Sequence, residues 1–225
     1  MSATVPRWVV ALLALALAAQ VAWQAARSGT SNNRDELPPA PGAAALRLAS
    51  FGEPEAAARL AMIFVQSHDS VDYARLLAWL ESVLALDPGT QYPLFAAARI
   101  YAETADEQHA RAALDFVYRH FLRDPARGWP WLAHAALLAK HRLKDLALAR
   151  SYARALEQHT AHLPLPLWAR QMEIFILEDM NELEAARIMI ASWLESGRLD
   201  DPAELRFLKQ RLEELEARIA GESVK

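Results

Sequence analysis

Two pairs of histidines are candidates for metal binding, because their spacing could place both imidazoles of a pair on one side of a helix. His159 and His162 are three residues apart, and His134 and His141 are seven apart on one predicted helix. A zinc site needs a third ligand at converging geometry, and the chain has neither an HExxH motif nor a cysteine. His159 and His162 come at a predicted helix end, where a histidine interacts favourably with the helix dipole. The sequence therefore predicts no metal site and no cofactor.

Residues 177–187 hold a group of carboxylates that could act as general acids or bases: Glu178, Asp179, Glu182 and Glu184. Such chemistry also needs a cleft and shifted pKa values. Here Asn181 is instead expected to cap a helix, with the acidic residues around its first turn. Glycines are too scattered for a phosphate-binding loop, and no specific Ser-His-Asp set occurs. We therefore predict that the chain is not an enzyme.

An aromatic cluster, Trp129-Pro130-Trp131, stands at the start of a predicted helix, and Trp168 follows further along the chain. Two interpretations are open. The tryptophans pack in the core between helix pairs, or one of them lines a concave surface where aromatic anchors bind peptides. The basic stretch 139–145 that follows is interpreted as a solvated turn, with Asp145 capping the next helix.

The composition indicates that helices position these residues. Hydrophobic residues make up 53% of the 225 positions, alanine and leucine dominate, and only 7 glycines are present. The formal charge of −4 argues against a chain built to neutralise phosphates, so nucleic acid is not expected as a partner. The absence of cysteine excludes disulfides, a thiolate nucleophile and a cysteine-based zinc site.

The amino terminus has the features of a membrane segment. Residues 8–26 carry no formal charge, and a bilayer span needs about 20 apolar residues. We predict that residues 1–27 form an uncleaved single-pass anchor; a cleaved signal peptide and a buried core helix are the alternatives. Arg7 favours a cytoplasmic N-terminus, while Arg27 and Arg34 oppose it. The expected location is a bacterial inner membrane, with the C-terminal part in the periplasm of a Gram-negative cell.

A linker and a repeated pattern follow the anchor. Residues 28–42 are rich in Ser, Asn, Pro and Gly and are predicted to form a linker. Beyond it, residues 43–225 are predicted to form one helical repeat domain. Its period is marked by prolines separated by 34, 37, 39 and 38 residues: Pro54, Pro88, Pro125, Pro164 and Pro202. A period in the 30s is typical of a solenoid built from helix pairs. The predicted fold is all-α, with four helix pairs and a C-terminal capping helix.

The pattern resembles the tetratricopeptide repeat. Ala98, Tyr101, Ala110 and Leu114 match the order of that repeat at spacings of 3, 9 and 4, and the Leu86–Pro88 stretch matches the end of a unit. The likeness covers residues 54–215 and implies a right-handed solenoid with a concave groove lined by the first helix of each pair. In that register the groove residues would be Arg99, Glu103, Trp131, Lys140, His141 and Glu173.

The predicted function is that of a membrane-anchored scaffold or adaptor. Its groove would bind a peptide or helix of a protein partner, as an assembly factor or accessory subunit of a bacterial envelope complex does. The main alternative is a small-ligand carrier or an enzyme that uses the groove as a pocket, and a third is a structural subunit buried in a larger assembly. The net charge after Glu36 is about −5, which disfavours flat docking on anionic lipid.

Overall fold

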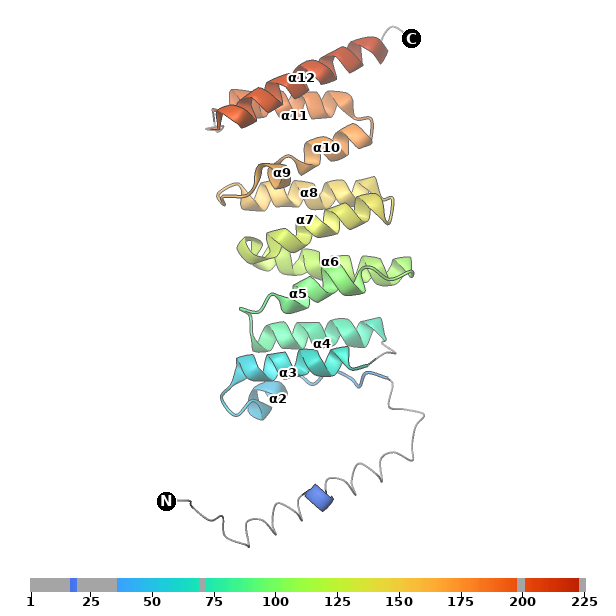
Figure 1. The fold of residues 1–225 in the computed structure, drawn as a ribbon, viewed down its shortest axis with the longest axis vertical. Helices are drawn as coiled ribbons and strands as arrows, with labels where there is room; N and C mark the ends of the chain where they lie inside the picture. The colour runs from blue at the N-terminus through green and yellow to red at the C-terminus, as the bar shows by residue number, and fades with distance from the viewer. Residues whose placement is uncertain (1–16, 20–35, 69–71, 198–200, 223–225) are drawn as a thin grey trace, which may run out of the picture. The chain divides into compact units, whose positions relative to one another are not determined.

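The computed structural model describes residues 17–19, 36–68, 72–197 and 201–222. In these residues the chain is all-helical, with helices joined by turns and short loops (Figure 1), so the predicted all-α class is confirmed. Within the described part of the chain, no helix combines the length and apolar character needed to cross a bilayer. The predicted anchor lies outside the described residues except for 17–19, and it stays a prediction.

The chain divides into two compact units, Met1–Asp87 and Pro88–Lys225, over which the predicted domain 43–225 is distributed. The described helices of the first unit are α2 (Ala43–Ala49), α3 (Pro54–Gln66) and α4 (Tyr73–Leu86). Proline occupies the start of α3, where its missing N–H costs no hydrogen bond. The carboxylate of Asp72 caps α4 by accepting from the backbone N–H of Ala74 at 2.8 Å. Met62, Val65, Leu76 and Leu80 are buried within this unit.

An extended strap, residues 36–41, lies along α4. Leu37 of this strap is fully buried. The Trp79 indole N–H donates to the Pro38 carbonyl at 2.8 Å, and the Ser82 hydroxyl donates to the Pro41 carbonyl at 3.0 Å. Arg75 donates to the Leu37 carbonyl at 3.1 Å. The end of the predicted linker thus belongs to the folded unit, whereas residues 28–35 lie outside the described residues.

The second unit contains the remaining helices: α5 (Tyr92–Ala96), η1 (Ala97–Tyr101), α6 (Glu107–Arg123), α7 (Pro125–His141), α8 (Leu146–Thr160), α9 (Leu167–Arg170), α10 (Met172–Asp179), α11 (Leu183–Glu195) and α12 (Pro202–Glu222). Neighbours in the chain pack on one another: η1 on α6, α6 on α7, α7 on α8, and α11 on α12. In Figure 1 these helices follow one another in chain order. Each part of the surface of this unit is therefore formed by helices that are close in sequence.

Aspartates cap several of these helices, as the sequence indicates. Asp106 accepts from the Gln108 N–H at 2.8 Å, and Asp201 accepts from the Ala203 N–H at 2.8 Å. Asp145 accepts from the Leu148 N–H at 2.9 Å, which confirms its predicted cap. Asn181 does not cap α11, and that prediction is wrong. It adopts a left-handed conformation (φ 58°) that closes α10, a role that asparagine fills nearly as readily as a cap.

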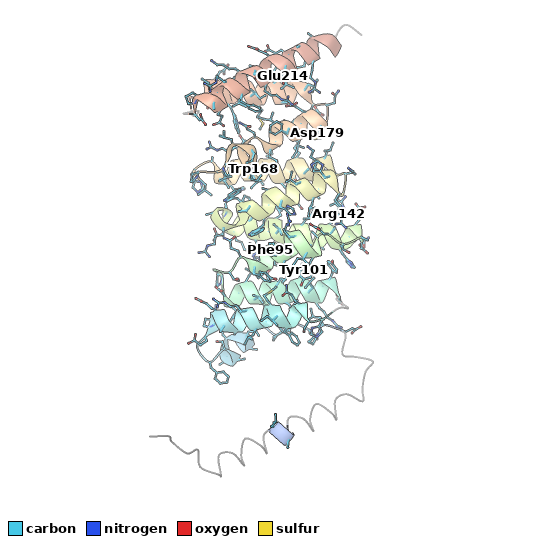
Figure 2. The ribbon with its side chains drawn as sticks, viewed as in Figure 1. Phe95, Tyr101, Arg142, Trp168, Asp179 and Glu214 are labelled. Atoms are coloured by element: carbon cyan, nitrogen blue, oxygen red, sulfur yellow. The ribbon has the colours of Figure 1, made fainter. Side chains whose placement is uncertain are left out.

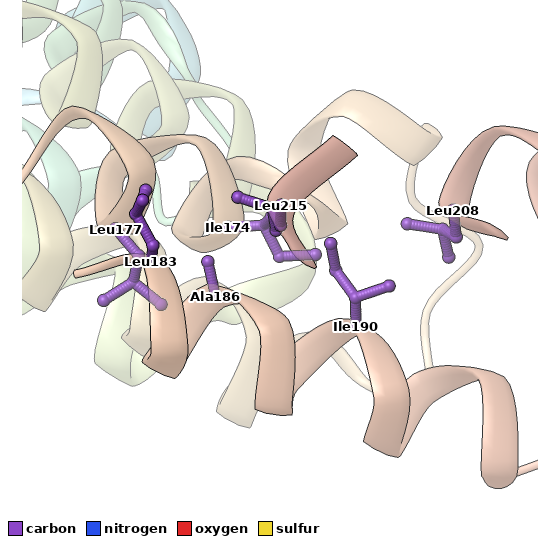
Figure 3. Packing of buried hydrophobic residues seen from close by; sticks show 7 residues of the cluster. All are labelled: Ile174, Leu177, Leu183, Ala186, Ile190, Leu208 and Leu215. Atoms are coloured by element: carbon purple, nitrogen blue, oxygen red, sulfur yellow. The ribbon is translucent and has the colours of Figure 1, made fainter. Parts of the chain in front are cut away.

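Small residues allow the helices to approach closely. Ala98 and Ala110, both matched to the repeat pattern, are buried, and so is Leu114. Gly128 on α7 is packed so tightly against α6 that a Cβ there would lie 2.7 Å from the Phe121 Cα. At the C-terminal end α10, α11 and α12 enclose an apolar cluster (Figure 3): Ile174, Leu177, Leu183, Ala186, Ile190, Leu208 and Leu215.

Three irregularities interrupt the helices that bear the predicted site. Residues 97–101 form a π-helical turn, closed by the Ala102 N–H donating to the Ala97 carbonyl at 2.9 Å. Pro130 lies inside α7, because that helix begins at Pro125 rather than at the aromatic cluster. The helix predicted after Pro164 is divided at Gln171 into α9 and α10.

Candidate partner-binding groove

An open groove in the second unit is lined mostly by aromatic side chains. We call it the aromatic groove, and its volume is about 420 Å³. It draws on α5, η1, α7 and α9, and Figure 2 labels Phe95 and Trp168 among its residues. The lining residues are Phe95, Arg99, Trp129, Pro130, Trp131, His134, Leu137 and Trp168.

Ring contacts hold the aromatic side chains in place. The Phe95 and Trp131 rings meet edge to face with centroids 5.6 Å apart, and those of Trp129 and Trp168 are 6.2 Å apart. The Trp131 indole N–H donates to the Gln91 side-chain oxygen at 3.0 Å. Because these contacts fix the rings without covering them, the groove offers ordered apolar surface to a ligand.

The three tryptophans are surface residues. Trp129 and Trp131 are partly buried, and Trp168 is 50% exposed. Trp131 packs on Phe95 of α5 and Trp129 on Trp168 of α9, so packing between helices and lining of the groove each account for part of their surface. Pro130, which stands between two of them, leaves the carbonyl of Ala126 without its helical donor and places an apolar ring in the groove wall.

Two polar side chains accompany the rings. Burial and the positive charge of Arg99 lower the pKa of His134, and the charge of Glu103 opposes that shift. The imidazole is therefore neutral at pH 7, and its Nε2 atom is buried without a hydrogen-bond partner. Arg99 is exposed, and its charge acts on His134. The groove thus combines apolar contact with a cation and an unpaired ring nitrogen.

The six predicted groove residues do not all meet there. Arg99 and Trp131 line the groove, and Glu103 is close enough to act on its histidine. His141 is exposed at the last position of α7. Lys140 forms an ion pair with Asp179 of α10, so reversing its charge would place two anions together and disturb the packing.

Glu173 lies in a different depression. This arginine–glutamate depression has a volume of about 380 Å³ and is formed by α8, α10 and α11. The carboxylate is only 2% exposed; Arg150 donates to its Oε1 at 3.2 Å, while its Oε2 has no hydrogen-bond partner. Nearby, Glu157 accepts from the Trp193 indole at 3.1 Å, and burial raises the pKa of Glu157. The buried carboxylate of Glu173 and the partly buried carboxylate of Glu157 thus connect α8 with α10 and α11.

Sequence reasoning missed several residues of the groove. Phe95 precedes Arg99 by one helical turn, and His134 follows Trp131 by three residues, so each shares a helix face with a residue that was identified. A spacing of three or four residues from Arg99 and Trp131 could therefore have predicted Phe95 and His134 as groove residues. The sequence analysis names Trp168 with the aromatic cluster but does not place it in the groove, because α9 has only four residues and the sequence pattern does not define its direction.

Neither a metal centre nor a known relative identifies the site. The described residues contain no group of three or more His, Cys, Asp or Glu side chains that could hold a metal ion. No family model, curated protein or solved structure matches the chain. The function must therefore be argued from the geometry of the groove itself.

Proposed function

We propose that this protein is a membrane-anchored, non-enzymatic adaptor that binds a segment of a partner protein in the aromatic groove. Three tryptophans around one open groove carry the proposal. Tryptophan is enriched among residues that dominate binding energy at interfaces, and its large rings become more stable when a partner covers them. An open groove with few convergent polar groups suits a polypeptide better than a small molecule.

The polar groups define the chemistry of the bound segment. Apolar side chains of the segment would lie over Trp129 and Trp168. A carboxylate would meet the exposed guanidinium of Arg99. The expected ligand is a peptide or helix with apolar anchors and an acidic residue.

The finer architecture belongs to the same proposal. The helices would form four tetratricopeptide-like pairs in a right-handed solenoid, followed by α12 as a cap. Support comes from the prolines at the starts of α3, α7 and α12 and from the packing of chain neighbours in the second unit. In that arrangement α5, α7 and α9 are first helices, and all three contribute to the aromatic groove.

Site-specific photocross-linking tests the proposed function. A photoreactive amino acid replaces Leu137, which lines the groove, or Leu122 on α6, which does not; both leucines are 40% exposed. In native membranes we expect the photoreactive group at position 137 to form an adduct with one partner protein. The group at position 122 should form no adduct with that partner. A Trp168→Ala exchange should abolish the adduct. Equal adducts from both positions, or none from position 137, would contradict the proposal.

A further inference from the structure

Exposed apolar side chains concentrate in one part of the first unit. Phe51 is 95% exposed, Leu48 83%, Leu60 66% and Ile63 62%, and all belong to α2, α3 or the turn between them. Together with the partly exposed Phe64 they form what we call the α2–α3 apolar surface. No other stretch of similar length in the described chain carries as many exposed large apolar side chains. Such a concentration marks an interaction surface.

An apolar stripe lies on the exposed side of α3, beside the exposed charged pair Glu55 and Arg59. Leu60, Ile63 and Phe64 are spaced by three and four residues and share one face, while Met62 and Val65 are buried on another. This stripe of large apolar side chains offers surface that an apolar environment would cover.

Backbone strain at Phe51 supports the same conclusion. Its φ of 50° lies in the left-handed region, which a phenylalanine adopts only with strain, and Gly52 follows at φ 92°. The almost completely exposed ring makes little packing contact that would offset this strain. Phe51 closes α2 in this conformation, as Asn181 closes α10, and presents its ring to the surroundings.

The length of chain before the strap indicates what covers this surface. Arg75, Trp79 and Ser82 bind the strap, so the first unit is fixed to the chain from Glu36 onward. Eight residues, 28–35, separate it from the end of the proposed anchor. Fully extended, eight residues span at most about 29 Å. This reasoning rests on the proposed anchor, which would keep the first unit next to the bilayer.

We propose that the α2–α3 apolar surface inserts into the interfacial layer of the membrane that holds the anchor. Apolar contact rather than charge would drive the insertion. Arg59 is paired with Glu55 in the same helix, and Arg47 donates to the carbonyl of Ala85, so these arginines are already occupied. Burial of Leu and Phe side chains at the acyl boundary binds zwitterionic and anionic lipids alike. The insertion is therefore insensitive to salt.

The cysteine-free chain allows a direct test on the full-length protein. Single cysteines replace Phe51 or Ile63, and a control replaces Ile188, which is 56% exposed on α11 of the second unit. Each carries an environment-sensitive fluorophore, and the protein is reconstituted into phosphatidylcholine vesicles. We expect nitroxide-labelled lipid to quench the fluorophore at 51 and 63, and aqueous iodide to quench it at 188. Anionic lipid or added salt should leave this pattern unchanged.

Two results would overturn the proposal. Quenching of positions 51 and 63 by iodide would show that the surface faces water. Shielding of both positions from lipid and iodide alike would show that protein covers it, either residues 8–26 of this chain or a second copy. Alkaline extraction of the vesicles reports separately on the anchor, and none of these readings depends on the aromatic groove. The experiments therefore distinguish a failure of the proposed membrane insertion from a failure of the proposed anchor or of the proposed adaptor function.

Discussion

Replacing Gly128 by alanine should destabilise the protein, although the same exchange usually stabilises a helix. Alanine exceeds glycine in helix propensity by about 1 kcal/mol. At position 128 the added methyl group would lie 2.7 Å from the Cα and 3.1 Å from the Cβ of Phe121 on α6. A backbone atom cannot rotate away, so α6 and α7 must separate. Overpacking costs about 1–3 kcal/mol, and because the contact is with backbone we expect a net loss of about 1–2 kcal/mol.

Thermal unfolding followed by far-UV circular dichroism measures this loss. For a chain of this size the expected decrease in melting temperature is roughly 2–8 °C. Gly221→Ala on α12 is the matched control, because no heavy atom lies within 4 Å of its added Cβ. The control should leave the melting temperature unchanged or raise it slightly. If Gly128→Ala raises it as well, the close approach of α6 and α7 is refuted.

Three further predictions concern the groove and the topology. Pro130→Ala should restore a helical hydrogen bond to Ala126 and stabilise the protein by about 1 kcal/mol or more, while weakening partner binding; lower stability would contradict this. The lowered pKa of His134 means that the unfolded state takes up a proton first as the pH falls below about 6.5, so stability declines there. In His134→Gln that decline should be smaller, and parallel pH profiles would refute the effect. A phosphatase fused after Lys225 should be active outside the cytoplasm, and activity of a cytosolic reporter instead would reverse the topology.

The sequence predicts the helices well because their signals are local. Aspartate followed by an Ala/Leu-rich run marks the starts of α6 and α8, and Pro202 after Asp201 marks that of α12. Asn181 shows the limit of such signals, since asparagine suits both a helix start and a left-handed helix end. The π-helical turn at 97–101 has no sequence signal of this kind, because its residues are ordinary helix formers.

Contacts between distant residues account for what the sequence does not predict. The strap has the composition of a linker, and its contacts with α4, such as the hydrogen bond of Trp79 to Pro38 41 residues away, show that it is part of the fold. Arg99 and Trp131 line the groove as predicted, although a π-helical turn and Pro130 interrupt the regular pattern beside them. Glu173 follows the break at Gln171, and a shift of one residue rotates a helical side chain by about 100°. That rotation is enough to place Glu173 in another depression.

The affinity of the cross-linked partner segment tests the central claim most directly. The segment identified at position 137 is synthesised, and its binding to the full-length protein is measured by calorimetry. Trp168→Ala should weaken binding at least tenfold, which corresponds to about 1.4 kcal/mol. Phe207→Ala is the matched control, because Phe207 is a similarly exposed aromatic residue with one ring contact, to Phe175 at 6.4 Å. The account predicts unchanged affinity for the control; equal affinity of both variants and the wild type would contradict it.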